Sequence, residues 1–317
     1  MPTTRSPRRG SLQFWPRKRA KKQTPVVRAH PFVKEPKLTG FAGYKVGMVQ
    51  AMFRDLKKTS PNFNLEVSHP ATLIECPPLK IVSTRFYKKT PYGLKAITEV
   101  LNPKLDKELA RKISLPKKAK NVDIDKACEK FDELRILVYT QPKLTTLETK
   151  RPAIFELTIG GSKEDQLKFV KENIDKELNV KDSFKTGDFV DVHAVTKGKG
   201  YQGPVKRYGV RLKSHKSEKS RRFAVLATEG VAKVEYFAHQ PGQMGYHLRL
   251  DYNKRILKML DDVKAMSHFK HYGELNSTCL LLKGSVPGPA KRLIRFNHAA
   301  RPSKKLVTPL TDVKIVK

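Results

Sequence analysis

The spacing of apolar and polar residues predicts short β-strands in two parts of the chain, which a segment of different pattern separates. Runs that are rich in β-branched and aromatic residues, and that end at turns such as Cys76-Pro-Pro78, are typical of strands. Because such runs dominate, we expect a mainly β protein. The predicted strands cover residues 41–48, 72–75, 79–88, 94–101, 186–195, 276–283 and 292–297.

Residues 101–185 have a different pattern and are predicted to form an inserted α+β lobe. Residues 122–134 repeat apolar side chains at helical spacing, and residues 135–140 and 153–160 resemble strands. Ser162 and Asp165 have the spacing of a helix capping box. The positions that would continue this helix are Leu167, Val170, Ile174 and Leu178.

The same reasoning predicts an amphipathic helix over residues 252–266, with Ile256, Leu257, Leu260 and Val263 directed inward. The patterns therefore divide the chain into four parts. We expect a basic extended arm (1–40), a β core (41–100 and 186–317), the inserted lobe (101–185), and a long loop (196–253) that leaves the core. The core is expected to end in a basic C-terminal tail.

Charge adds the first indication of function. The 317 residues include 65 Lys or Arg and 30 Asp or Glu, which gives a formal net charge of +35. This charge is too high for an ordinary soluble enzyme and indicates a polyanionic partner. The lobe holds 15 of the acids and has a net charge of only +4, so it can fold without an anion. We interpret its acids as solvated helix faces rather than catalytic pairs.

Residues 1–34 contain ten Lys or Arg, five prolines and no acid. The prolines exclude a long helix, so an extended basic arm is predicted. A nuclear-import-like or merely solvated tail is the alternative.

Residues 196–253 combine cations, glycines and aromatic residues. Between Lys197 and Arg222 there are ten Lys or Arg and one acid, Glu218. The segment shows no regular apolar period, so we expect no core of its own and predict that RNA orders it. A solvated charged loop is the alternative. The rings that could stack on unpaired bases are Tyr201, Tyr208, Phe223, Tyr236 and Tyr246.

Within this segment, Gly198-Lys-Gly200-Tyr-Gln-Gly203 has the glycine spacing of a dinucleotide-binding motif. That motif requires a following helix and an acid about twenty residues later. Pro204 and Gly209 interrupt the expected helix, and Phe223 occupies the place of the acid. We therefore exclude a dinucleotide site.

Other chemistry finds little support. Cys76, Cys128 and Cys279 are widely spaced and form no C-x-x-C pair, so we expect no zinc site or disulfide and interpret each as a small apolar filler. We also interpret His193 as structural. The sequence contains no apolar run of eighteen residues, so we expect no membrane span. It also contains no nucleophile–base set and no P-loop, and we expect a protein that is not an enzyme and binds no cofactor or metal.

Five motifs, in order along nearly the whole chain, resemble the family of the third universal protein of the large ribosomal subunit, in its archaeal and eukaryotic branch. They are Ser11-Leu-Gln-Phe-Trp-Pro-Arg-Lys-Arg19, Phe41-Ala-Gly-Tyr-Lys-Val-Gly-Met48, Lys197-Gly-Lys-Gly-Tyr-Gln-Gly203, Gly242-Gln-Met-Gly-Tyr-His247 and Leu282-Lys-Gly-Ser-Val-Pro-Gly288.

The resemblance implies a closed β-barrel of the kind shared with translation factors. It implies binding to large-subunit rRNA near its 3′ end, a role in early assembly, neighbouring large-subunit proteins as partners, and a cytoplasmic location in the ribosome. The long loop would extend toward the peptidyl-transferase centre without catalysing a reaction there. The resemblance also places Gly245 in the part of this loop that returns to the β core.

The chain departs from the family at two places. Relatives usually carry a Trp at the loop tip, whereas the only Trp here is Trp15 and the tip, residues 226–231, has Glu229 in the nearest position. Where relatives read Arg-Thr-Glu after the histidine, this chain reads Arg249-Leu-Asp251.

Residues and resemblance together predict an rRNA-binding protein. An RNA-modifying or nucleotide-dependent enzyme and a general nucleic-acid-packing protein are the alternatives. The predicted rRNA-binding residues are Arg8, Arg9, Arg17, Lys18, Arg19, Lys21, Lys22, Lys197, Lys199, Gly200, Tyr201, Gln202, Gly203, Lys206, Arg207, Arg211, Lys213, Lys216, Lys219, Arg221, Arg222, Gln243, Tyr246, His247 and Arg249.

Overall fold

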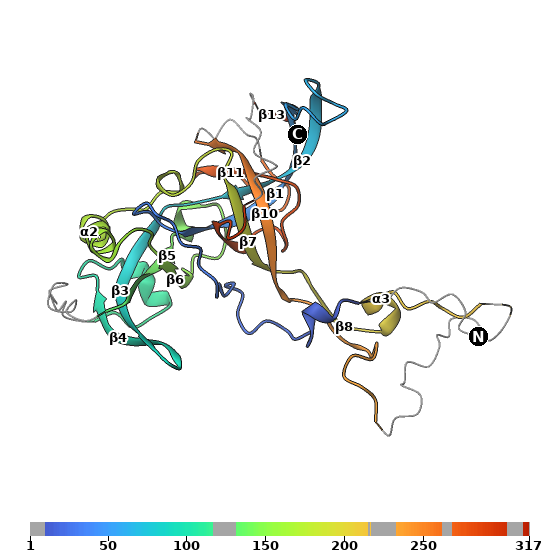
Figure 1. Ribbon diagram of the computed structural model, residues 1–317, viewed down its shortest axis with the longest axis horizontal. Helices are drawn as coiled ribbons and strands as arrows, with labels where there is room; N and C mark the ends of the chain where they lie inside the picture. Colours follow the sequence, from blue (N-terminus) through green and yellow to red (C-terminus); the bar gives the residue numbers. More distant parts are fainter. Residues whose placement is uncertain are drawn as a thin grey trace. The chain divides into compact units, whose positions relative to one another are not determined.

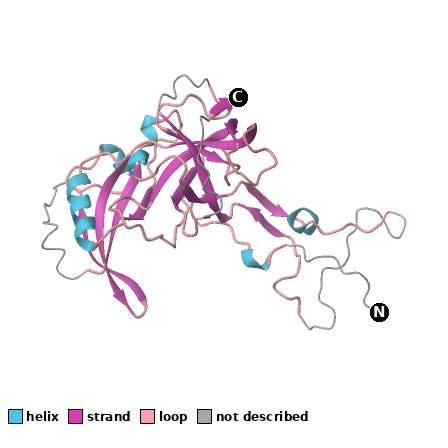
Figure 2. Ribbon diagram, turned by 45° about the horizontal axis from the view of Figure 1, so that its top comes forward, coloured by secondary structure: helices cyan, strands magenta, loops and turns pink. Residues whose placement is uncertain are grey.

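The computed structural model describes residues 10–116, 131–214, 216, 233–261, 268–302 and 313–316. The chain divides into two compact units. The hairpin unit consists of Met1–Lys22 and Val195–Leu248, and the body unit consists of Gln23–Ala194 and Arg249–Lys317. As the sequence predicts, the structure is mainly β (Figures 1 and 2).

The larger sheet has seven strands in the order β12-β7-β10-β11-β2-β1-β13. Strand β1 also pairs with β12, so the pairings of six strands form a ring, from which only β13 is left out. The first residues of β1 pair with β12 and its later residues pair with β2. The strands are β1 (Gly40–Arg54), β2 (Glu66–Glu75), β7 (Phe189–Val195), β10 (Leu248–Leu260), β11 (Cys279–Lys283), β12 (Leu293–His298) and β13 (Lys314–Val316).

The smaller sheet has the order β4-β3-β5-β6 and lies in the body unit. It comprises β3 (Leu79–Thr90), β4 (Gly93–Leu101), β5 (Glu133–Thr140) and β6 (Ile154–Thr158). Helix α2 (Lys163–Asn173) follows β6 and begins with the predicted capping box, in which Asp165 N donates to Ser162 Oγ at 3.3 Å. The predicted division at residue 101 stays a prediction, although β3 and β4 share a sheet with β5 and β6.

A large apolar core fills the body unit, beside a small second cluster of Val82, Leu109 and Tyr139. Phe296 on β12 packs against Phe41 on β1, with ring centroids 6.2 Å apart, and against Phe184 at 5.3 Å. All three rings are fully buried. Val170 of α2 joins the same cluster, which explains the apolar spacing along that helix.

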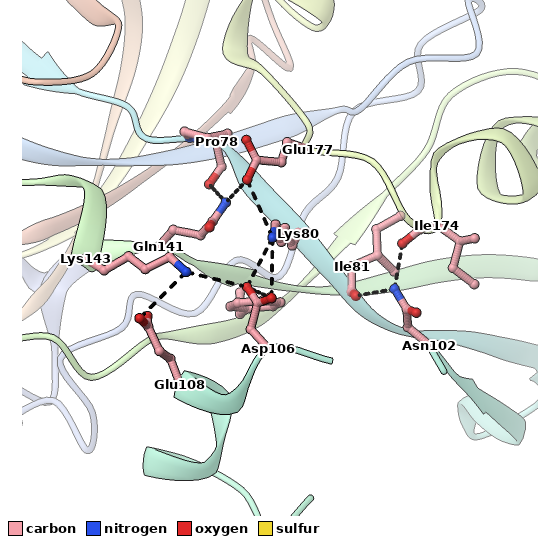
Figure 3. A network of polar contacts seen from close by, with 11 residues as sticks. Pro78, Lys80, Ile81, Asn102, Asp106, Glu108, Gln141, Lys143, Ile174 and Glu177 are labelled. Atoms are coloured by element: carbon pink, nitrogen blue, oxygen red, sulfur yellow. Dashed lines mark hydrogen bonds and ion pairs between the residues drawn. The ribbon is translucent and has the colours of Figure 1, made fainter. Parts of the chain in front are cut away.

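Polar contacts fix the segment after β4 to the smaller sheet (Figure 3). Lys80 of β3 donates to Asp106 Oδ2 at 3.1 Å, and Tyr139 of β5 donates to the same oxygen at 2.7 Å. Partial burial raises the pKa of Asp106, but these two hydrogen bonds outweigh it and hold that pKa below its ordinary value. Asn102 Nδ2 reaches the carbonyls of Ile81 and Ile174, at 3.2 and 2.6 Å. Two distant parts of the lobe, near Asn102 and at Ile174, are thereby joined to strand β3.

A buried arginine attaches the N-terminal part of the body unit to the sheets. Arg295 donates from Nη1 to Pro25 O at 3.1 Å and from Nη2 to Glu156 O at 2.6 Å. Its guanidinium lies 4.4 Å from the centre of the Phe155 ring. Burial lowers its pKa to about 9. Residues near Pro25, which the sequence places in an extended arm, are therefore packed in the body unit.

Most predicted strands are confirmed, with shifted ends. The helix predicted over residues 252–266 is wrong, because Leu248–Leu260 is strand β10. A register shift between Ile256 and Lys258 buries the neighbouring residues Ile256 and Leu257 together, which imitates helical spacing. Residues 122–130 of the other predicted helix lie outside the described residues, and Leu134 belongs to β5. Leu178 follows α2 and pairs with Leu79.

Shorter elements complete the described chain. They are η1 (Leu12–Phe14), η2 (Lys107–Arg111), η3 (Pro142–Leu144), η4 (Val180–Asp182), β8 (Gly198–Gln202), α3 (Pro204–Tyr208) and β9 (Gly242–Gly245). Cys76 and Cys279 are free and buried, as apolar fillers should be, and Cys128 lies outside the described residues. His193 lies buried in β7. Within the described part of the chain, no helix has the length and apolar character that crossing a membrane requires.

Candidate nucleic-acid interface

The two ends of the predicted long loop pair with each other. β8 and β9 form an antiparallel hairpin in which Tyr201 faces Gln243 and Gln202 faces Gly242. Gly245 makes this pairing possible: its φ is +71°, and a Cβ added to it would lie 2.0 Å from Lys197 O. The two ends of the segment therefore have regular secondary structure, which the apolar pattern does not predict, and ordering of the segment by RNA stays a prediction.

A single helical turn follows β8. α3 starts with Pro204 at its first position and ends at Gly209, which adopts the left-handed conformation with φ +70°. Proline and glycine thus bound this helix rather than prevent it, which corrects the expectation that they interrupt it. The turn has only five residues, and the sequence has no acid at the distance that a dinucleotide site requires.

An aromatic cluster joins the arm to the hairpin. Trp15 stacks on Tyr208 with ring centroids 5.9 Å apart, and Tyr208 contacts His239 at 4.6 Å. The Arg17 guanidinium lies 4.4 Å from the centre of the Tyr208 ring. Tyr208 is therefore only 6% exposed and is not available for base stacking, contrary to the sequence prediction.

Two other predicted stacking rings face solvent. Tyr201 and Tyr236 are each 76% exposed. Tyr246 is partly exposed and lies under Arg19, whose guanidinium is 5.6 Å from the ring centre. Phe223 lies outside the described residues.

Arg207 connects α3 to strand β9 and the residues before it. Its Nη1 donates to Gln240 O at 2.8 Å and its Nε donates to Gln243 O at 3.2 Å. These bonds join α3 to the approach and first residues of β9. The guanidinium is thus already bound to carbonyl oxygens, and its predicted RNA contact stays a prediction.

The N-terminal arm lies along the return of the loop. Ala20 N donates to Tyr246 O at 2.8 Å, and Nδ1 of the buried His247 lies 2.8 Å from Lys18 O. Thr196 Oγ1 accepts from His247 N at 3.1 Å. Arm and loop, which the sequence presents as separate basic segments, are one structural unit. No periodicity in the sequence signals this, because the contacts are single hydrogen bonds and ring stacks.

The hairpin unit is almost purely cationic. Its described residues include thirteen Lys or Arg and one acid, Glu235. In the body unit, by contrast, cations meet acids, as where Arg85 binds Glu99 Oε2 and Glu156 Oε1 at 2.8 and 2.6 Å. A surface with so few acids retains its positive field and attracts phosphates.

The predicted RNA-binding residues differ in exposure. The partly exposed ones are Arg17, Gln202, Arg207, Lys213, Gln243, Tyr246 and Arg249. The exposed ones are Lys18, Arg19, Lys21, Lys22, Lys197, Lys199, Gly200, Tyr201, Gly203, Lys206, Arg211 and Lys216. Those outside the described residues are Arg8, Arg9, Lys219, Arg221 and Arg222, together with the loop tip at 226–231. His247 is buried.

Possible metal ligands do not gather in the described part of the chain. The described residues hold no group of three or more His, Cys, Asp or Glu side chains placed to bind a metal ion. The arrangement offers cations, two open rings and close backbone turns, which suit binding to a single-stranded or irregular nucleic acid.

Comparisons with known proteins agree with this geometry. The family model described as Ribosomal protein L3 matches residues 1–315. The chain is 44% identical to the large ribosomal subunit protein uL3 of Archaeoglobus fulgidus, over 94% of this chain and 93% of the relative. It is 43% identical to that of Methanocaldococcus jannaschii, over 95% and 93%, and 42% identical to that of Methanobrevibacter smithii, over 94% and 93%.

Proposed function

Because the chain belongs to the ribosomal protein L3 family and is a structural constituent of the large ribosomal subunit in the cytoplasmic ribosome, we propose that its hairpin unit binds large-subunit rRNA. The observation that carries this proposal is the composition of that unit. Its described residues include thirteen Lys or Arg and a single acid, and the side chains of Tyr201 and Tyr236 are exposed. Neutralised phosphates and stacked bases are the contacts that such a surface offers.

The binding involves both basic segments together. Lys18, Arg19, Lys197 and Lys199 are exposed, and backbone hydrogen bonds join the arm to the return of the loop. An RNA that contacts the hairpin therefore contacts the arm as well. In this proposal the loop beyond α3 extends toward the peptidyl-transferase centre. The protein supports early assembly of the large subunit, and the loop catalyses no reaction.

The proposed architecture has two further parts. The ring of six paired strands supports a closed barrel of the kind found in translation factors. Residues 101–185 are the proposed insertion that distinguishes the longer archaeal and eukaryotic branch. The barrel holds both ends of the loop, because β7 leads into the loop and β10 receives it.

The test is filter binding of the full chain to a fragment from the 3′ region of large-subunit rRNA, across a salt series, with duplex DNA of equal length as the control. We expect six to ten neutralised phosphates, each contributing about −0.9 or −0.7 to the slope of log affinity against log salt. A slope near −1 would contradict binding through several segments. Equal affinity for the DNA would favour a general nucleic-acid-packing protein.

A further inference from the structure

The smaller sheet has two edges, and the chain itself covers one of them. Alongside β6, Thr39 N donates to Thr158 O at 3.1 Å and Gly160 N donates to Lys37 O at 2.9 Å. At the other edge, β4 pairs with β3 on one side. Among the described residues, no segment pairs with the opposite side of β4. About every second residue of this nine-residue strand thus directs its backbone N–H and C=O away from β3, with no strand partner among the described residues.

This open edge is apolar. Tyr92 at the β3–β4 turn is fully exposed, Ile97 is 51% exposed, and Leu94 and Leu101 are 39% and 43% exposed. Folded proteins usually protect a long edge strand with charges, prolines, bulges or a covering segment. β4 has a register shift at Ile97 and carries Lys95 and Glu99, yet Leu94, Ile97 and Leu101 stay exposed. A row of exposed apolar residues beside unpaired backbone is instead typical of a surface that another chain covers.

Leu94 and Leu101 lie on the same face of the sheet. Leu94 pairs with Lys89 and Leu101 pairs with Ser83 across the β3–β4 ladder. Lys89 and Ser83 lie an even number of residues apart on β3, so they and their partners lie on the same side of the sheet. Ala96 and Glu99 lie between these two leucines on the same face, because their partners Tyr87 and Arg85 have the same parity on β3. A strand added beside β4 would therefore meet Leu94 at one end and Leu101 at the other.

The β3–β4 hairpin is also cationic. Residues 86–98 contain Lys88, Lys89 and Lys95 and no acid. The next acid, Glu99, already accepts hydrogen bonds from Arg85 and Ser83. Lys88 pairs with Lys95, so these two lysines lie on the opposite face of the sheet from Leu94. Acids on that face of an added strand would complement them, whereas a basic segment would be repelled.

We propose that the outer edge of β4 binds an extended segment of a neighbouring large-subunit protein, which adds one strand to this sheet. The segment carries apolar residues at alternate positions, toward Leu94 and Leu101, and acids on its other face, toward Lys88 and Lys95. An RNA backbone would satisfy the lysines but would leave Leu94, Ile97 and Leu101 uncovered and the strand edge unpaired, so a protein strand fits better. The proposal rests on membership of the large subunit, and not on rRNA binding by the hairpin unit.

The first test is an electron cryo-microscopy map of native large subunits that contain this chain. We expect main-chain density of another protein alongside β4, with hydrogen bonds to its outer edge. Density for rRNA, for a second copy of this chain or for another segment of the same chain at that edge would overturn the proposal, as would solvent. The same map reports whether the hairpin unit touches rRNA, so failure of one proposal is distinguishable from failure of the other.

Two matched variants then separate the contributions. Leu94→Asn/Ile97→Asn keeps the charge and removes two of the exposed apolar side chains. Lys88→Gln/Lys89→Gln/Lys95→Gln keeps the apolar side chains and removes the charge. We expect the first to lower the amount of the strand-donating protein in purified subunits by about tenfold, measured by quantitative mass spectrometry, and the second to lower it only about twofold.

A larger loss with the lysine variant, or no loss with either, would overturn the proposal. All five side chains are exposed or partly exposed, so both proteins should fold, and thermal melts of the free chains check this. If the double asparagine variant melts early, Ile97→Asn alone repeats the measurement, because Ile97 lies at the register shift of the ladder.

Discussion

The body unit and the hairpin unit hold their chains in order by different means. In the body unit, fully buried rings such as Phe41 and Phe296 pack in one apolar cluster, and cations meet acids. In the hairpin unit, order comes from strand pairing, from the stack of Trp15 on Tyr208 and from the carbonyl contacts of Arg207. The first arrangement is stabilised by removing apolar surface from water. The second leaves thirteen cations almost without acids, which costs free energy until a polyanion arrives.

The largest expected effect lies in the body unit. Phe296→Ala removes a ring that touches both Phe41 and Phe184, and should lower the free energy of unfolding by about 3–5 kcal/mol in urea titrations. Tyr236→Ala in the hairpin unit is the matched control, because that ring is 76% exposed, and it should change the value by less than about 1 kcal/mol. Similar losses from both would mean that the two units do not differ in this way.

A second effect concerns pH. Burial, followed by the nearby charge of Arg295, lowers the pKa of His193 to about 4. The unfolded chain, with a pKa near 6.5, binds this proton more tightly, so stability is complete above pH 6.5 and falls as pH drops toward 4. The loss should approach about 3 kcal/mol, since each pKa unit corresponds to about 1.4 kcal/mol.

His193→Gln should flatten this dependence in urea titrations between pH 7 and pH 4.5. The same lowering of pKa to about 4 occurs at His30 and has the same sign, so part of the slope remains in the variant. An unchanged slope in the variant would show that His193 is not the source. Hydrogen exchange should locate the loss in the body unit rather than at residues 198–208.

A smaller effect should distinguish two glycines of the hairpin unit. Gly245→Ala places a Cβ against Lys197 O and forces an alanine to φ +71°, which should cost about 1–3 kcal/mol locally. Gly203→Ala meets open space at an ordinary φ and should be neutral for folding. Hydrogen exchange of the β8–β9 amides measures the difference, while the melt of the body unit should not move. Equal protection in both variants would contradict this account of the hairpin.

The smallest effect is electrostatic. Lys199→Gln should reduce the salt slope of rRNA binding by about one phosphate contact, or about 0.7–0.9, and leave the thermal melt unchanged. Lys112→Gln, an equally exposed change in the body unit, should leave the slope as it is. Should both variants lower the slope alike, the RNA-binding surface would extend well beyond the hairpin unit.

The sequence predicts the strands well where β-branched and aromatic residues cluster, as in Leu79–Thr90 and Leu293–His298. It fails at Ile256 and Leu257, because a register shift buries two successive residues and removes the alternation that marks a strand. Residue propensity and apolar period predict regular elements. The position of a register shift depends instead on pairing with the neighbouring strand, which the local sequence does not contain.

For the candidate interface, sequence reasoning finds the cations but not their roles. Arg207 and Lys199 look alike in the sequence, yet Arg207 is bound to two carbonyls and Lys199 is exposed. Trp15 and Tyr208 are almost two hundred residues apart, so their stacking leaves no local signal. Long-range contacts between single side chains have no period, so the sequence contains no signal that the arm and the loop are in contact.

The contact between Arg295 and Pro25 has a consequence for the order in which the chain matures on the ribosome that synthesises it. The two residues are 270 positions apart, so at about 5–20 residues per second the arginine follows its partner by roughly fifteen to fifty seconds. Strand β1 likewise waits for β12, which closes the ring. The basic N-terminus is therefore made long before its docking site exists. During that interval the nascent arm is exposed to any nearby polyanion, and the seating of Pro25 in the body unit marks a chain that is almost complete.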